Sequence, residues 1–311
     1  MPDWKEVLDE IQGEVNRGTP NPLDVIRRKY LLELHKKTGR NIIAYYSGWL
    51  QRGNMIDVIV NDKDKNAFMV NIHKLDRTKG LDLILHTPGG DLAATESIVD
   101  YLNQMFGNNI RAIIPQISMS AGTMMALATR EIIMGKQSNL GPIDPQMGGV
   151  PCQAVLDEFQ KAKDDIKANP QAAPLWQAII SKYHPTFLGA CQYSIDWSEK
   201  LTNDWLQRNM CKGDESRTKK ILKEFIDHKT NKSHSRHISK ENCKQIGVAV
   251  LDMEQDNELQ DLILTVHHSY MHTFASSMAL KIVENHLGIA YVENMPMQMP
   301  MQMPQQIHQL I

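Results

Sequence analysis

The stretch between residues 81 and 141 most constrains the fold, because short apolar runs and helical patterns alternate along it. This alternation is the pattern of parallel strands joined by right-handed helical crossovers. The predicted strands are residues 83–85, 112–114 and 132–134, and the predicted helices are residues 92–106 and 121–128. The sequence therefore predicts an α/β fold.

Two turns of this segment follow predicted strands, at the edge where parallel sheets bind ligands. The first contains Gly89 and Gly90 just before a helix, and the second contains Ser120 and Ala121 at the start of the next helix. Glycine N–H groups and helix N-termini suit a developing negative charge, so the amides of Gly89, Gly90 and Ala121 are candidates for an oxyanion hole. Ser120 is the candidate nucleophile. The structural alternatives are a tight glycine turn and a serine that caps a helix.

Three motifs together resemble the serine dehydrogenase proteinase family, which belongs with the Clp protease proteolytic subunit and signal peptide peptidase A to the Clp/crotonase superfamily. The motifs are residues 86–90 (His-Thr-Pro-Gly-Gly), 120–123 (Ser-Ala-Gly-Thr) and 140–145 (Leu-Gly-Pro-Ile-Asp-Pro), and the similarity spans roughly residues 40–252. The resemblance implies a Clp/crotonase-like ββα-superhelix core and a serine endopeptidase that forms an acyl-enzyme on Ser120. It also implies a homo-oligomer, peptide or unfolded protein substrates, and no cofactor.

A serine hydroxyl needs a base within hydrogen-bond reach and a third group that orients the base. By the resemblance, Asp144 stands where the Clp histidine falls and His234 lies close to where the Clp aspartate falls, so the two residue types are exchanged. The serine dehydrogenase proteinase family is described with this order of Ser, Asp and His. The resemblance therefore implies Ser120 as nucleophile, His234 as general base and Asp144 as the orienting carboxylate. His237 is the substitute for His234.

Other roles stay open for these residues. Asp144 before Pro145 also suits a turn, and a lone histidine in a Lys- and Ser-rich stretch, such as His234, is commonly a surface residue. Signal peptide peptidases use a desolvated lysine as base, but the matching stretch here, residues 150–154, holds no lysine. Lys161 lies further along the same predicted helix among acidic residues and is the candidate base of a Ser-Lys dyad, the second mechanism.

Two other functions are compatible with this fold. An acyl-coenzyme A enzyme of the crotonase type shares the fold and the oxyanion hole. The serine in the nucleophile position and the lack of an obvious basic cluster for the coenzyme A phosphates speak against it. A non-catalytic scaffold would keep the cleft without the base, and the missing lysine and the displaced histidine keep this alternative open.

Composition excludes several classes of function. A formal net charge of -2 gives no electrostatic case for nucleic acid binding. The four cysteines lie too far apart in sequence for a zinc ribbon or a redox dithiol, so we expect no metal site and a reducing compartment. The chain has no apolar run of about 18 residues and no secretion signal at its start, so we expect a cytoplasmic protein without a transmembrane segment.

The remaining segments are expected to flank one main domain, residues 39–252. Residues 1–38 are predicted as a helical N-terminal arm and residues 253–290 as a C-terminal helix over 256–287, and both are candidate assembly elements. Prolines forbid a regular helix in the Met-, Pro- and Gln-rich tail, residues 291–311, so we expect it to be disordered. Further strands are predicted at residues 42–46 and 56–60, and a mostly helical region at 155–225 packs through Trp176, Trp197 and Trp205.

Overall fold

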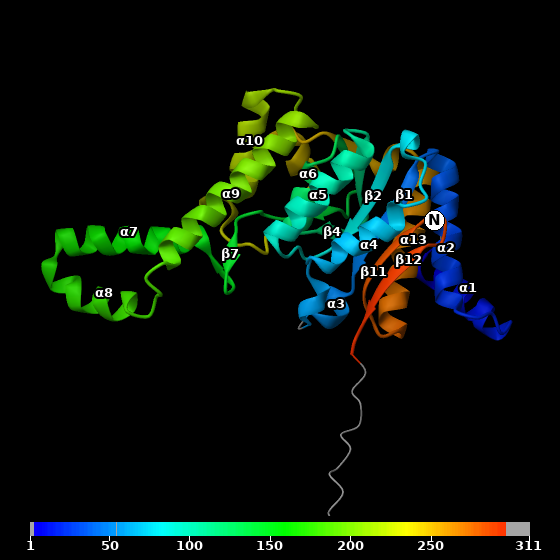
Figure 1. The fold of residues 1–311 in the computed structure, drawn as a ribbon, viewed down its shortest axis with the longest axis horizontal. Coiled ribbons are helices and arrows are strands. Elements are labelled where there is room, and N and C mark those ends of the chain that lie inside the picture. The colour runs from blue at the N-terminus through cyan, green and yellow to red at the C-terminus, as the bar shows by residue number, and fades with distance from the viewer. Residues whose placement is uncertain (1–2, 54, 297–311) are drawn as a thin grey trace, which may run out of the picture.

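The protein, a computed structural model that describes residues 3–53 and 55–296, is built on a central seven-stranded sheet (Figure 1). The strands, in sheet order, are β10 (Val250–Asp252), β5 (Glu131–Met134), β3 (Ile110–Ile114), β2 (Leu81–His86), β1 (Asn41–Ser47), β11 (Ala279–Asn285) and β12 (Ala290–Asn294). The first five are parallel, and the last two are antiparallel to their neighbours. The predicted α/β class, with parallel strands and helical crossovers, is confirmed.

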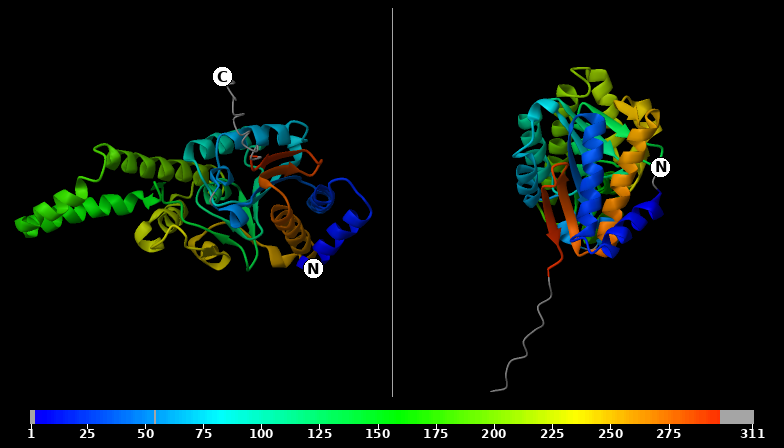
Figure 2. Two further views of the ribbon diagram at one scale, coloured as in Figure 1. Left: turned by 90° about the horizontal axis from the view of Figure 1, so that it is seen from below. Right: turned by 90° about the vertical axis from the view of Figure 1, so that its right-hand side faces the viewer.

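Helices cover both faces of the sheet and bury two separate cores. One face carries α4 (Lys63–Ile72), α5 (Leu92–Phe106) and α6 (Ala121–Leu127), and the other carries α1 (Trp4–Asn16), α2 (Pro22–Thr38) and α13 (Asn257–Ser276). Successive side chains of a strand point to opposite faces, so Tyr45 of β1 joins the first core and Tyr46 joins the second. Figure 2 shows α2 and α13 side by side on their face.

The N-terminal helices belong to this second core. Arg27 of α2 lies with its Nε 2.9 Å from Oε2 of Glu284 in β11, and both side chains are buried. Leu31 and Leu34 are fully buried as well. The two predicted N-terminal helices are therefore present, with the break between them at residues 17–21, but α2 is packed on the sheet and does not form a free arm.

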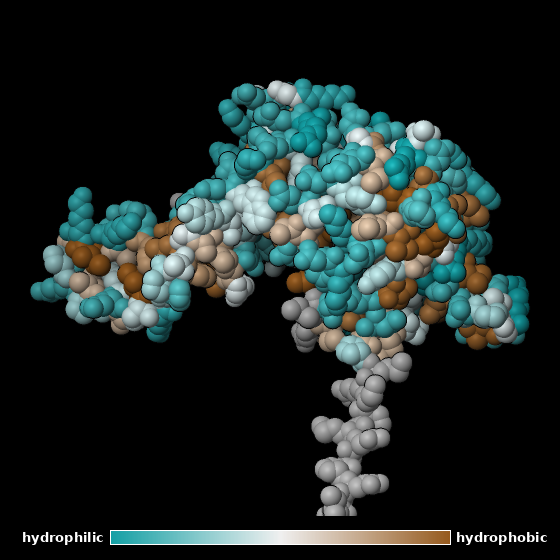
Figure 3. Space-filling model, in the orientation of Figure 1, coloured by the Kyte–Doolittle hydropathy of each residue, from teal (hydrophilic) through white to brown (hydrophobic). Residues whose placement is uncertain are grey.

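A helical projection leaves the body after β8 (Val150–Pro151) and is visible in Figures 1 and 2. It consists of α7 (Cys152–Ala168), α8 (Ala173–Ile180) and α9 (Phe187–Arg208), and α9 leads back to the body. The predicted breaks at Asn169-Pro170 and His184-Pro185 fall between these helices. Figure 3 shows apolar side chains on the surface of the projection, where Leu175 and Tyr193 are exposed. Among the described helices, none has both the length and the apolar character needed to cross a membrane.

The helix predicted at residues 256–287 is wrong beyond Ser276. There α13 ends, and the chain returns as β11 between β1 and β12. All residues of β11 are buried, and periodicity alone cannot distinguish a fully buried strand from a buried helix. The strand β12 continues to Asn294, inside the stretch expected to be a disordered tail. Residues 297–311 of that tail lie outside the described residues.

The strand predicted at residues 56–60 is also wrong. Its first part is a 3-10 turn, Ile56–Val58, and Val60 forms an isolated β-bridge with Gly90. The Val60 N–H donates to the Gly89 carbonyl over 2.8 Å, and the Asp91 N–H donates to the Val60 carbonyl over 2.9 Å. This segment therefore fixes the glycine turn that follows β2.

A small three-stranded sheet brings the three sequence motifs to one place. Its strands are β4 (Ile117–Ser118), β6 (Asn139–Leu140) and β9 (Ile238–Ser239). The first leads into Ser120, the second leads into Asp144, and the third follows His234 in sequence. A bridge between Thr87 and Ser118 links this sheet to the glycine turn. Motifs that are distant in sequence thus converge on one edge of the molecule.

Candidate active site

Ser120 lies in a strained turn between β4 and α6. Its backbone has φ 50° and ψ -119°, in a region of conformational space that residues with a side chain rarely adopt. Within the described residues its side chain makes no capping hydrogen bond to α6, so the capping role is not what places a serine here. A strained turn from strand to helix that presents a serine is the geometry of a nucleophile elbow.

The glycine turn packs directly against this serine. Gly89 has φ 93°, and a Cβ atom on it would lie 2.6 Å from Cβ of Ser120 and 2.7 Å from the amide nitrogen of Ala121. A Cβ atom on Gly90 would lie 2.4 Å from the backbone nitrogen and oxygen of Val60. Both positions require glycine because of close backbone approach, and at Gly89 the positive φ adds a second reason.

Two backbone amides, one in the glycine turn and one after Ser120, are free to bind an anion. The Gly89 N–H donates to Oγ1 of Thr87 over 3.2 Å, so it is already engaged. This differs from the expectation that the amides of both glycines are available to an oxyanion. The N–H groups of Gly90 and Ala121 have no acceptor among the residues that the structure describes. Both residues line one cleft together with Ser120, and Ala121 begins α6. This leaves Gly90 and Ala121 as the candidate donors of an oxyanion hole.

Ser120 and His234 line the same cleft, which has a volume of about 520 Å³. The wall also includes the glycine turn, the start of α5, residues 143 and 145–147, and three residues of α9. Its apolar members are Ile59, Pro88, Leu92, Ala93, Ala121, Met124, Ile143, Pro145, Met147 and Trp197. Trp197 therefore lines the cleft, whereas Trp176 and Trp205 are buried, as predicted.

His234 and Asp144 form a hydrogen-bonded pair. Nδ1 of His234 lies 2.9 Å from Oδ1 of Asp144, although the two residues are 90 positions apart in sequence. The Asp144 side chain is only 3% exposed, whereas His234 is 22% exposed and reaches the cleft. The loop before Asp144 is fixed by the Ile143 N–H, which donates to the carbonyl of Phe225 over 2.9 Å. A carboxylate held on one imidazole nitrogen leaves the other nitrogen free to act as a base.

A second histidine, which sequence reasoning missed, faces the same carboxylate. Nδ1 of His228 lies 3.6 Å from Oδ2 of Asp144, whereas His234 approaches Oδ1. No motif of the resemblance includes His228, and the packing of α11 (His228–Asn231) beside α10 (Glu215–Ile226) brings it there. Only the tertiary structure identifies this residue.

The two alternative bases do not reach the cleft. His237 is exposed and is not among the residues that line it. Lys161 is exposed on α7, in the projection, and does not line the cleft either. Within the described residues, no cluster of three His, Cys, Asp or Glu side chains is arranged to hold a metal ion.

His86, the first residue of the glycine motif, is buried on the other face of the sheet. Its ring packs at 5.3 Å from the ring of His267 in α13 and at 5.4 Å from that of Tyr46, measured between centroids. Burial lowers the pKa of His86 to about 4, so the imidazole is neutral at physiological pH. His86 therefore packs in the core next to the glycine turn and does not line the cleft.

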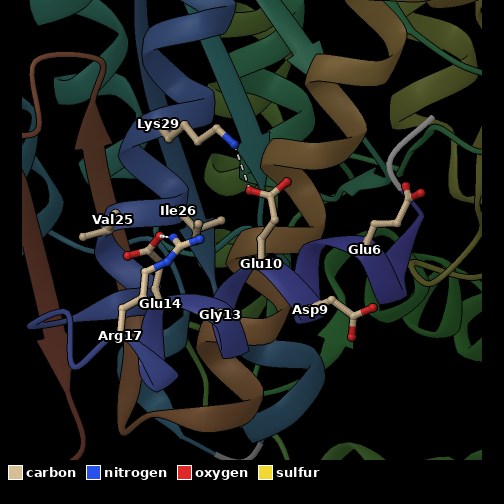
Figure 4. A pocket seen from close by; sticks show the side chains of 9 residues that line it. All are labelled: Glu6, Asp9, Glu10, Gly13, Glu14, Arg17, Val25, Ile26 and Lys29. Atoms are coloured by element: carbon tan, nitrogen blue, oxygen red, sulfur yellow. Dashed lines mark hydrogen bonds and ion pairs between the residues drawn. The ribbon is translucent and has the colours of Figure 1, made fainter.

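A larger cavity, of about 680 Å³, lies between α1 and α2 (Figure 4). Its charged groups are largely paired with one another: Nζ of Lys29 lies 2.8 Å from Oε2 of Glu10, and Arg17 pairs with Glu14. It contains no residue of the motifs. Paired surface charges of this kind stabilise helix packing and do not define a reactive site.

Comparison with known proteins identifies the family. The family model described as ClpP-like SDH-type serine proteinase matches residues 22–272. The chain belongs to this family. The match covers both glycine and serine turns, Asp144 and His234, and it extends the similarity beyond the residues 40–252 that the motifs indicated.

The individual relatives add little about function. Two uncharacterized proteins of Methanocaldococcus jannaschii are 31% identical over 156 residues and 30% identical over 143 residues, which are 48% and 45% of this chain. These matches cover 52% and 49% of the relatives, so the chain spans about half the length of the curated relatives it matches. A solved structure, the 1510-N membrane-bound stomatin-specific protease in a mutant form, aligns with 66% of this chain and 79% of its own at 18% identity. Its TM-score of 0.38 is too low to bear on function.

Proposed function

We propose that the protein is a serine endopeptidase that hydrolyses peptide bonds through an acyl-enzyme on Ser120. One observation carries this proposal: a serine in a strained turn shares a cleft with two free backbone amides and with a histidine that is bound to a buried carboxylate. Membership of the ClpP-like SDH-type serine proteinases supports it. The substrates we propose are peptides or unfolded protein segments, whose extended backbone fits an open cleft.

The proposed reaction proceeds in two halves. In the first, Nε2 of His234 takes the proton of the Ser120 hydroxyl while Oγ bonds to the peptide carbonyl carbon. The N–H groups of Gly90 and Ala121 bind the resulting oxyanion. The C–N bond then breaks, and the proton on His234 passes to the leaving amine.

The second half releases the acid product. A water molecule gives a proton to His234 and attacks the ester carbonyl carbon, through the same oxyanion hole. The C–Oγ bond breaks, and Ser120 recovers its proton from His234. While His234 is positively charged, Asp144 stabilises that charge by accepting the hydrogen bond from its Nδ1–H.

With this function we propose two finer features that the resemblance implies, a ββα-superhelix core and a homo-oligomer, and the cytoplasmic location that the sequence composition led us to expect. A crotonase-type function has less support. The residues that line the cleft include no Lys or Arg for the phosphates of coenzyme A. The non-catalytic scaffold becomes the better account only if the test below fails.

The proposal is tested with a fluorophosphonate probe and with fluorescein-labelled casein as an unfolded substrate. We expect wild type to be labelled and to cleave casein, and Ser120→Ala and His234→Ala each to lower the rate by about 10³-fold or more. The matched controls His237→Ala and Lys161→Ala are expected to keep the wild-type rate. A wild-type protein that neither reacts nor cleaves, or a Ser120→Ala variant that still does both, contradicts the proposal.

A further inference from the structure

The second oxygen of Asp144 is not accounted for by the mechanism. Oδ1 accepts from His234, but Oδ2 is buried and has no hydrogen-bond partner among the described residues. The nearest candidate is Nδ1 of His228, which is also buried and without a hydrogen bond, 3.6 Å away. Buried polar atoms are nearly always bonded, so a buried donor and a buried acceptor that face one another at this distance require an explanation.

The distance is short enough to close. A hydrogen bond between nitrogen and oxygen is about 2.9 Å long, so a movement of about 0.7 Å would complete it. Hydrogen bonds of catalytic groups are often long in the free enzyme and tighten when substrate binds. The neighbouring bond from His234 is already formed at 2.9 Å. A second donor on Oδ2 would stop the carboxylate from rotating away from His234.

We propose that His228 is a positioning residue for this pair: it donates from Nδ1 to Oδ2 of Asp144 and so holds the carboxylate in place for His234. The inference rests on the proposed peptidase function. His228 is not a catalytic residue in this account, because it does not line the cleft. It acts on Ser120 only through Asp144 and His234.

Two variants test whether a donor at position 228 matters. His228→Gln keeps a donor, and His228→Leu has none. The readout is the rate of fluorophosphonate labelling of the full chain, with thermal unfolding as a control on folding. We expect His228→Gln to keep most of the wild-type rate, because its amide can donate to Oδ2 of Asp144. We expect His228→Leu to be about tenfold slower.

The outcomes separate this inference from the function beneath it. If labelling in wild type is lost with Ser120→Ala but both His228 variants are labelled at the wild-type rate, the inference is overturned and the peptidase proposal stands. If His228→Gln is as slow as His228→Leu, the residue is merely structural and the inference is again overturned. If labelling persists in Ser120→Ala, the peptidase proposal fails and the inference falls with it.

Discussion

The two halves of the cleft are built in different ways. On the nucleophile half, Gly90 and Ala121 contribute backbone amides and line the cleft with Ser120. Gly90 belongs to the turn after β2, and Ala121 follows the turn after β4. The base half consists of side chains: Asp144 forms a hydrogen bond with His234, which lies 90 positions further along the sequence. The closely packed backbone of the nucleophile half leaves no room for an added side-chain atom at Gly89 or Gly90. The base half depends instead on the charge and the hydrogen-bond donors of its side chains. The two halves should therefore fail in different ways when mutated.

The histidines follow the same division. His86 supports the glycine turn as a buried neutral ring, whereas His228 and His234 are 20% and 22% exposed around a carboxylate. The first contributes to packing, and the others lie beside Asp144. One residue type thus packs in the core in one half and belongs to the proposed mechanism in the other.

The largest effect is expected on the base half, from Asp144→Asn. The amide has nearly the same shape but no charge, and it can present its NH₂ to Nδ1, which favours the wrong tautomer of His234. We expect the casein rate to fall by about 10³-fold or more while thermal unfolding stays close to wild type. A variant within tenfold of wild type would show that the two halves do not work together.

The nucleophile half is tested by Gly89→Ala, with Gly107→Ala as the matched control. Both glycines have positive φ, 93° and 59°, but only at Gly89 would the new Cβ atom meet other atoms, with nothing within 4 Å at Gly107. The positive φ should cost each variant about 1–2 kcal/mol of stability in urea unfolding, and Gly89→Ala should lose more because its Cβ atom also meets backbone atoms. We expect Gly89→Ala also to lose about 10²-fold in labelling rate, because Ser120 and the Ala121 amide must shift. Equal activity of both variants would contradict the backbone account.

The smallest effect concerns His86 and appears only in stability. The unfolded chain takes up this proton at about pH 6.5, but the native protein resists protonation until the pH falls to about 4, because burial lowers the pKa of His86. The contribution of neutral His86 to the free energy of unfolding is therefore intact above pH 6.5 and is lost as the pH falls from 6.5 towards 4. We expect wild type to lose about 2 kcal/mol more unfolding free energy between pH 7 and pH 5 than His86→Phe. Parallel losses in urea titrations would contradict this assignment.

Local sequence predicted the strands, turns and helices of the nucleophile half because their signals are local. A strand, two glycines and a helix are contiguous in sequence, and so are β4, Ser120 and α6. The engaged amide of Gly89 was not predictable, because it depends on the rotamer of Thr87. Residues 256–287 misled because β11 is buried on both faces and carries no alternation.

The base half was accessible only through the resemblance. Nothing in the spacing of Asp144 and His234 places them in contact, and the segment between them contains the whole projection. His228 had no signal at all, since it lies outside every motif and reaches Oδ2 through the packing of α11. Contacts between side chains that are far apart in sequence depend on how helices pack, which one sequence does not encode in any short pattern.

A crystal structure of the wild-type protein after reaction with a fluorophosphonate tests most directly whether the two halves meet on one atom. The account predicts a phosphonyl group on Oγ of Ser120, with its oxygen accepting hydrogen bonds from the N–H groups of Gly90 and Ala121. It also predicts Nε2 of His234 on the same side, with Nδ1 still bonded to Asp144. An adduct on another residue, or an oxygen directed away from both amides, would contradict the central claim.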